Sequence, residues 1–252
     1  MRSLILSPHL DDAALSCTSV FRQVPRPAVV NLFAGLPPHG RVGGADRVAG
    51  VADSRSRMLA RIEEDRRVLD GFDVEPSNLT LLDAQYRTAG DWRAMPPLGP
   101  AALIDALEDA ALLAADVGRV YAPMAIGQHP DHLATREAAL ALARARGYAL
   151  TLYADVPVVF GLGGWPSWAR EMTGRRSEGG LPAVWRSRLA ARGRVLAAEY
   201  GQARAVRVDG AAKIAALRGY GPKFAQLDVE FAGAVSDPAR MSVEMFLDVR
   251  TA

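Results

Sequence analysis

The sequence predicts an α/β fold, with a Rossmann-like, mostly parallel sheet that carries helices on both faces. Short apolar runs alternate along the chain with longer stretches of helical periodicity, which is typical of βαβ units. Two of the apolar runs end at a proline and are followed at once by histidine and aspartate residues. In an open parallel sheet, ligands bind beyond the carboxyl ends of the strands, so we expect the active site at these ends.

The first part of the chain is expected to contain four strands and four helices. The strands cover residues 3–7, 28–33, 78–82 and 119–122, and the first and last of them end at Pro8 and Pro123. The helices cover residues 12–23, 54–69, 101–115 and about 131–146. The Gly- and Pro-rich segment 34–50 is expected to be a long loop over the site, and 90–100 a second Pro-rich loop.

The last hundred residues carry weaker signals. The Gly-, Trp- and Arg-rich segment 160–182 is expected to be a flexible loop, whose Trp165 and Trp168 either stack on a sugar ring or pack onto the body. Helices are expected at 188–200 and 210–218, and strands at 205–208 and 243–249. Lys213 either meets a substrate phosphate or carboxylate or is an ordinary solvated lysine. We expect residues 183–252 to complete one domain that spans 1–252.

Composition narrows the class of function. The 252-residue chain is 50% hydrophobic, and its net charge of +2 comes from scattered basic residues, which disfavours nucleic acid as a partner. The single cysteine, Cys17, excludes an internal disulfide and a Cys-based zinc cluster. The apolar run before His9 is too short for a signal peptide, and no run approaches a membrane span. We therefore expect a cytoplasmic protein that acts on a small molecule, with a homo-oligomer left open.

The first chemical motif, Ser7-Pro8-His9-Leu10-Asp11-Asp12, follows the first strand and opens a helix. An imidazole and two carboxylates at a strand end form a candidate site. A simpler interpretation exists for each residue. Either aspartate would accept hydrogen bonds as the helix N-cap, and His9 would be a satisfied loop histidine.

A second motif with the same layout, Gln128-His129-Pro130-Asp131-His132, follows the fourth strand. Three of the four histidines of the chain fall in these two motifs, and the fourth, His39, lies in the loop at 34–50. Because the carboxyl ends of parallel strands lie side by side, the two motifs are expected to form one site.

The residue types in the two motifs favour a mononuclear metal hydrolase. Catalytic zinc takes three His or carboxylate ligands and leaves a position for water, whose pKa it lowers to roughly 7. The expected ligands are His9, Asp12 and His132. Asp11 remains as the general base for the metal-bound water. His129 would stabilise an oxyanion or protonate the leaving amine, and Asp131 would fix an imidazole tautomer.

The motifs SPHLDDAALS and GQHPDHLATREA resemble the PIG-L/LmbE-like family of zinc-dependent de-N-acetylases, in particular a bacterial branch with SPHLDDA. The resemblance spans roughly residues 4–220. It implies a Rossmann-like fold, Zn²⁺, and the same roles for the ligands and for Asp11 and His129. Arg61 to Asp65 is similar to the family's R-x-x-E-D helix and Leu82 to Arg87 to its substrate-side loop, which makes three residues candidates for substrate binding: Arg61, Asp83 and Arg87.

The sequence also departs from the family pattern. Leu10 and Ala13 stand where many members have Pro and Glu, and Gly127 stands where some have a tyrosine near the oxyanion. Gly221 and Pro222 follow Tyr220 where relatives often have Ser-Gln.

The resemblance implies an N-deacetylase, a hydrolase of linear amide C–N bonds, which acts on an N-acetylated amino sugar, a glycoside or another sugar-containing metabolite. Two alternatives stay open: an amidase for another C–N bond of a small metabolite, and a non-catalytic binding module. Another divalent ion in place of zinc also stays open, since His/carboxylate sites accept several.

Overall fold

The computed structural model describes residues 1–114, 116–190 and 200–250. Its centre is one sheet of eight strands in the order β3-β2-β1-β4-β5-β8-β7-β6. The strands are β1 (Arg2–Ser7), β2 (Pro27–Asn31), β3 (Ser77–Asn78), β4 (Val117–Pro123), β5 (Ala149–Tyr153), β6 (Arg176–Gly179), β7 (Tyr200–Arg207) and β8 (Val243–Val249).

The sheet has a parallel part and an antiparallel part. β1 pairs in parallel with β2 on one side and with β4 on the other, and β3 and β5 extend this parallel part. From β5 onward the pairing is antiparallel, through β8 and β7 to β6. The prediction of an α/β fold with a mostly parallel sheet is therefore confirmed, and the parallel part consists of the first five strands.

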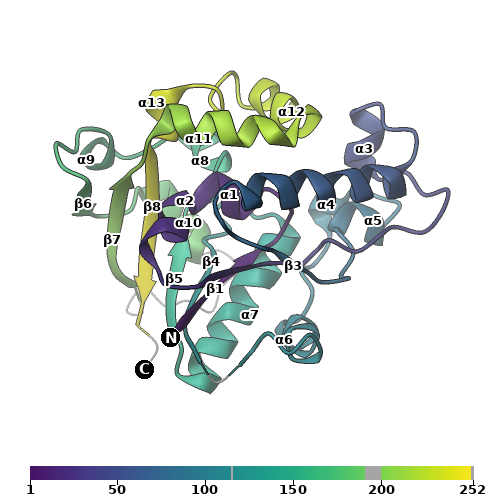
Figure 1. Ribbon diagram of the computed structural model, residues 1–252, viewed down its shortest axis with the longest axis horizontal. Coiled ribbons are helices and arrows are strands. Elements are labelled where there is room, and N and C mark those ends of the chain that lie inside the picture. The colour runs from purple at the N-terminus through teal and green to yellow at the C-terminus, as the bar shows by residue number, and fades with distance from the viewer. Residues whose placement is uncertain (115, 191–199, 251–252) are drawn as a thin grey trace.

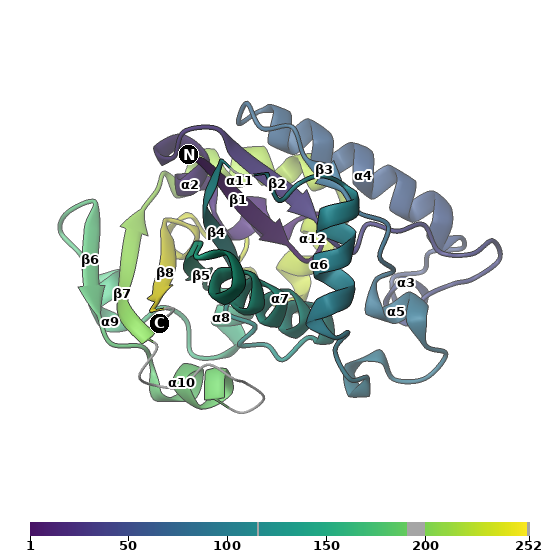
Figure 2. The ribbon, with the colours of Figure 1, turned by 90° about the horizontal axis from the view of Figure 1, so that it is seen from below.

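Helices surround the sheet. They are α1 (Asp12–Ser16), α2 (Thr18–Gln23), α3 (Gly44–Val48), α4 (Ser54–Asp70), α5 (Ala84–Arg87), α6 (Pro100–Asp109), α7 (Pro130–Arg146), α8 (Val158–Gly161), α9 (Ser167–Arg170), α10 (Ala183–Ala190), α11 (Gly210–Leu217), α12 (Pro222–Glu230) and α13 (Pro238–Met241), with 3-10 turns η1 (Trp92–Ala94) and η3 (Arg218–Tyr220). Figure 1 shows α4, α11 and α12 above the sheet, and Figure 2, seen from below, shows α6 and α7 in front of it.

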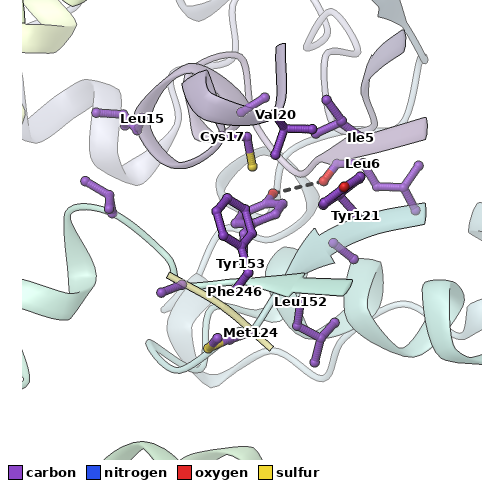
Figure 3. Packing of buried hydrophobic residues seen from close by; sticks show 14 of the residues in the cluster. Ile5, Leu6, Leu15, Cys17, Val20, Tyr121, Met124, Leu152, Tyr153 and Phe246 are labelled. Atoms are coloured by element: carbon purple, nitrogen blue, oxygen red, sulfur yellow. Dashed lines mark hydrogen bonds between the residues drawn. The ribbon is translucent and has the colours of Figure 1, made fainter. Parts of the chain in front are cut away.

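The strand β1 lies in the middle of the core. Its residues Leu4, Ile5 and Leu6 are fully buried, because a parallel strand with helices on both faces has no solvated side. Tyr153 of β5 reaches across and donates its hydroxyl proton to the carbonyl of Leu6 at 2.9 Å, as the dashed line in Figure 3 shows. This bond satisfies a buried phenol at the strand that leads into the first motif.

The helix predicted over 12–23 is broken at Cys17 into α1 and α2. The Glu244 carboxylate of β8 accepts hydrogen bonds from the backbone N–H groups of Thr18 and Ser19, at 2.8 and 2.9 Å. It thereby satisfies donors that would otherwise be orphaned at the start of α2. Because Glu244 is more than two hundred residues away in the sequence, no local pattern indicated this break.

Other elements match or miss the predictions. The helices α4, α7 and α11 and the strand β8 are confirmed, whereas β5 was not predicted and the third strand shrinks to two residues. The helix expected at 188–200 falls largely on residues outside the described part of the chain. The segment 34–50 contains the short helix α3, which packs against α5.

The segment 160–182 is more regular than the loop that was expected, since it contains α9 and β6. Trp165 is buried and donates to the carbonyl of Arg240 at 2.7 Å, and Trp168 donates to the carbonyl of Gly180 at 3.0 Å. Trp165 belongs to the hydrophobic core and Trp168 packs against it, so both tryptophans pack onto the body, which was one of the two alternatives. Within the described residues, no helix is long and apolar enough to cross a membrane.

Candidate metal and catalytic site

The two sequence motifs meet at one edge of the sheet, as predicted. His9 lies in the turn after β1, and His132 lies in the first turn of α7, which follows β4. β1 and β4 are paired neighbours, with Leu4 opposite Val120 and Ile5 opposite Tyr121. The ring centroids of His9 and His132 are 5.3 Å apart.

Asp12 lies between these two histidines. Its Oδ2 atom is 3.4 Å from His9 Nδ1 and 3.3 Å from His132 Nε2. The same oxygen accepts a hydrogen bond from the backbone N–H of His9 at 2.8 Å, which fixes the carboxylate against the turn. Each of the three side chains offers one ligand atom, and these atoms all lie within 4.8 Å of one another.

These separations fit a divalent metal. In a tetrahedral zinc site with bonds of about 2.0–2.1 Å, neighbouring ligand atoms lie about 3.3–3.4 Å apart. The two distances from Asp12 match this spacing. Two imidazole nitrogens and one carboxylate oxygen are also the donor set of catalytic zinc sites.

The electrostatics of this group also favour a cation. Burial alone would lower the pKa of His9, but Asp83, Asp12 and Asp131 raise it to about 9. Burial likewise opposes the charged form of His132, yet Asp12 and Asp155 hold its pKa well above the ordinary value. The two rings in turn hold the pKa of Asp12 well below its usual range against the effect of burial. The carboxylates thus create a buried site that attracts positive charge.

Each imidazole has a carboxylate on its other nitrogen. His132 Nδ1 lies 2.6 Å from Asp155 Oδ1, and His9 Nε2 lies 3.1 Å from Asp131 Oδ2. Such carboxylate contacts fix the tautomer and orientation of metal-binding histidines. The structure therefore places Asp131 against His9. The Asp155 contact was missed, although Asp155 follows β5 in the same strand-end pattern that identified the two motifs.

Asp11 adjoins this group but does not belong to it. Its side chain forms no N-cap hydrogen bond with α1, so the simple capping interpretation does not hold. The carboxylate is buried, and its Oδ1 accepts a hydrogen bond from Arg61 of α4 at 3.5 Å. Arg61 is itself buried and paired with this carboxylate.

The residues of the predicted substrate-side loop lie beside His9. Asp83 Oδ2 is 3.8 Å from His9 Nε2, and the Asp83 side chain caps α5 by accepting from the N–H of Gln85. Arg87 is paired with Asp131, whose second oxygen also accepts from the N–H of Ala84. The Nε and Nη1 atoms of Arg87 are buried and have no hydrogen-bond partner among the described residues.

His129 faces the other two histidines from the N-terminus of α7. Its Nδ1 atom accepts the backbone N–H of Asp131 at 3.2 Å as the cap of this helix, so the proton of the neutral ring sits on Nε2. Its ring lies edge-on to His9, with centroids 4.8 Å apart. Burial, together with positive charge on His9 and His132, holds the pKa of His129 well below its ordinary value.

One further aromatic residue lies at the site. The Trp92 ring of η1 packs on His129 with centroids 4.5 Å apart, and the Arg93 guanidinium lies 4.5 Å from the Trp92 ring. Sequence reasoning missed this contact, since Trp92 belongs to the segment 90–100, which showed only a loop composition.

A second set of ligand atoms overlaps the first. His9, Asp83, His129 and Asp131 also place one ligand atom each within 4.8 Å of one another. His9 belongs to both sets. The set around Asp12 differs in that its carboxylate contacts both histidines, and it has the neighbouring carboxylate of Asp11.

Comparisons with known proteins agree with this fold. No protein-family model and no curated protein sequence matches the chain. Among solved structures, the antimicrobial reagent A40926 pseudoaglycone deacetylase Dbv21 is similar over 100% of this chain and 98% of its own, with 27% identity and a TM-score of 0.66. A deacetylase in complex with teicoplanin, from the biosynthesis pathway of teicoplanin, covers 100% and 99% at 24% identity and a TM-score of 0.63. A zinc-inhibited form of the teicoplanin deacetylase Orf2 covers the same shares at 23% identity and a TM-score of 0.62, so these two share the fold.

Proposed function

We propose that this protein is a metal-dependent hydrolase that removes an N-acetyl or similar N-acyl group from an amino sugar or sugar-containing metabolite. The observation that carries the proposal is the contact of one buried carboxylate, Asp12, with both His9 and His132 at metal-ligand spacing. The full-length similarity to the pseudoaglycone deacetylase Dbv21 supports the choice of reaction. The sequence motifs that resemble the PIG-L/LmbE-like de-N-acetylases point the same way.

His9, Asp12 and His132 would hold the metal, which we propose to be zinc. When bound, such an ion lowers the pKa of a coordinated water and polarises an amide carbonyl. Asp131 and Asp155 orient the two imidazoles so that the opposite nitrogens face Asp12 and would be available to the ion. The single domain, 1–252, supplies all of these residues.

Asp11 is the proposed general base. It takes a proton from the attacking water as the bond to the amide carbon forms, and it passes a proton on to the departing amine. The Arg61 guanidinium holds this carboxylate in place through the contact at 3.5 Å. We therefore assign Arg61 to positioning of the base rather than to direct contact with the substrate.

His129 is the proposed donor to the oxyanion. Because its Nδ1 accepts the N–H of Asp131, the neutral ring has its proton on Nε2. A neutral imidazole donates a hydrogen bond without carrying a charge of its own, which agrees with the lowered pKa of this ring. The donor that some relatives take from a tyrosine at the position of Gly127 is thus replaced by His129.

Arg87 and Asp83 complete the proposed site on the substrate side. Arg87 is paired with Asp131 and has two buried donor atoms without a partner among the described residues. We propose that Arg87 and Asp83 hold polar groups of the substrate next to the scissile amide.

The test is acetate release from a panel of N-acetylated amino sugars and glycosides, with N-acetyl amino acids as a second group. We expect acetate and free amine in equal amounts from the sugars, loss of release on chelation, and recovery on addition of zinc. Release only from the amino acids would instead support the alternative amidase. A protein that binds metal stoichiometrically but releases acetate from neither group would contradict the proposal.

A further inference from the structure

A cavity of about 640 Å³ opens away from the metal and catalytic site. Its lining comes from α2, β7, the first turn of α11 and the start of β6, and Figure 1 shows α2, β7 and α11 in the same part of the molecule. None of the histidines or aspartates of the candidate site lines it. We call it the basic cavity, because its lining includes these residues: Arg22, Arg175, Arg176, Arg207 and Lys213.

The four arginines of the basic cavity are exposed and form no ion pair with any residue in the described part of the chain. Arg176 donates to the side-chain oxygen of Gln23 at 3.0 Å, and Arg207 donates to the carbonyl of Met172 at 2.8 Å. These neutral partners hold the guanidinium groups in place without neutralising them. The cavity therefore combines several uncompensated positive charges in one concave surface.

The inner wall of the basic cavity carries a buried cation. The side chain of Lys213 is only 2% exposed, and its ammonium donates to Glu244 Oε1 at 2.6 Å. Glu244 accepts four further hydrogen bonds, from the backbone and hydroxyl groups of Thr18 and Ser19. An ammonium has three donors, so Lys213 keeps donor capacity after its bond to this well-satisfied carboxylate.

Negative charge in the lining is small. Among the described residues that line the cavity, Asp209 is the one with a carboxylate, and it is engaged as the cap of α11 through the N–H of Ala212 at 3.0 Å. Phe72 and Val206 supply an apolar part of the wall. The lining thus offers charged hydrogen-bond donors and also an apolar surface that the uncharged part of a ligand would contact.

We propose that the basic cavity binds the phosphate groups of a small organic metabolite such as a nucleoside diphosphate. Arginine guanidinium groups match the geometry of phosphate oxygens and donate to them in pairs. The volume lies within the range of small-molecule sites, which is about 300–1,000 Å³. Phe72 and Val206 would contact the organic part. This site goes beyond the proposed hydrolysis and does not depend on it.

The experiment is calorimetric titration of the full chain with ADP and, separately, with inorganic pyrophosphate. The test variant is Arg22→Gln with Arg207→Gln. Its matched control is Arg218→Gln with Arg250→Gln, which removes the same charge from exposed positions outside the cavity. A third variant, His9→Ala, reports on binding of the probes at the metal site. Thermal melting confirms that all variants fold.

We expect both probes to bind, with ADP tighter because of the apolar wall. The Arg22/Arg207 variant should bind ADP about tenfold more weakly or worse than the wild type, the size expected for lost charge-assisted hydrogen bonds. The Arg218/Arg250 control and His9→Ala should each bind ADP with an affinity within about twofold of the wild type, a change well below that loss. Absence of ADP binding, an equal loss in both arginine pairs, or a loss confined to His9→Ala would each overturn the proposal. Equal affinity for ADP and pyrophosphate would overturn the assignment of an organic ligand.

Discussion

Asp155 lies behind His132, with its Oδ1 atom 2.6 Å from the Nδ1 atom of the ring, so that Nε2 is the nitrogen that faces Asp12. The other oxygen of Asp155 accepts the backbone N–H of Ile126 at 3.1 Å. This second hydrogen bond holds the Asp155 carboxylate against the segment that follows β4. The orientation of a proposed metal ligand is therefore set by a residue that follows the neighbouring strand, β5.

From this contact we expect Asp155→Asn to weaken metal binding by about 10–100-fold, the usual cost of losing such a carboxylate. The amide keeps the shape of the side chain but weakens its attraction for the ring N–H. Metal affinity is measured by competition with a chromophoric chelator. Asp248→Asn, at a half-exposed carboxylate on β8, is the control and should bind metal like the wild type. An unchanged affinity in Asp155→Asn would remove the proposed role.

His9→Ala and His132→Ala should each lose bound metal and activity together. Each removes one of three ligands, and the remaining pair cannot complete a catalytic zinc site. Elemental analysis of the purified variants measures the metal, and acetate release measures the activity. His39→Ala removes the fourth histidine and is the matched control. Stoichiometric metal in either test variant would show that the ligand set is wrong.

His129→Ala should retain the metal and lower kcat by about a hundred- to a thousandfold, the effect of losing one oxyanion donor. The change removes the Nε2 proton donor while His9, Asp12 and His132 remain. Metal content and steady-state kinetics measured on the same preparation separate the two effects. Loss of metal in this variant would favour the second ligand set, which includes His129.

The buried carboxyl group of Asp65 should make the free energy of unfolding depend on pH. It accepts hydrogen bonds from Tyr220 at 2.7 Å and from Asn31 at 2.6 Å, but burial raises its pKa from 3.8 to about 7. Protonated Asp65 is thus favoured in the folded state. Its contribution to stability is complete below the ordinary pKa and is lost as the pH rises through the folded pKa.

The free energy of unfolding of the wild type should therefore fall between about pH 4 and pH 7, relative to Asp65→Asn, by on the order of 4 kcal/mol. Urea unfolding of both proteins across this range measures the difference. Asp70→Asn, at an exposed position of the same helix, is the control and should follow the wild type. A constant difference between wild type and Asp65→Asn would show that Asp65 ionises normally.

The sequence patterns identified those parts of the fold and site that depend on local chemistry. The buried run at 4–6 was recognised as a strand because it is continuously apolar, and the run at 243–249 because most of its residues are apolar. The motif residues were found because histidine and aspartate follow strand ends, and the β1–β4 pairing brings them together.

Contacts between distant segments were not predictable in this way. Trp92 lies 37 positions before His129, in a segment whose composition is typical of a loop. Only the folded chain brings the two rings together. Lys213 was expected either to meet a substrate phosphate or carboxylate or to be solvated, and the second alternative is wrong because Lys213 is buried against Glu244. This burial depends on the contact between Lys213 of α11 and Glu244 of β8, a residue 31 positions later in the chain, which no periodicity reveals.

The proposed mechanism depends most on the separate roles of two adjacent carboxylates, Asp11 and Asp12. The decisive measurement is metal content and kcat for acetate release in Asp11→Asn and Asp12→Asn, prepared in parallel. We expect Asp11→Asn to keep the metal and KM but to lose about a hundred- to ten-thousandfold in kcat, as for a general base. We expect Asp12→Asn to lose the metal and the activity together. If Asp11→Asn loses the metal while Asp12→Asn keeps it, or if Asp11→Asn keeps both metal and full activity, the proposed mechanism is contradicted.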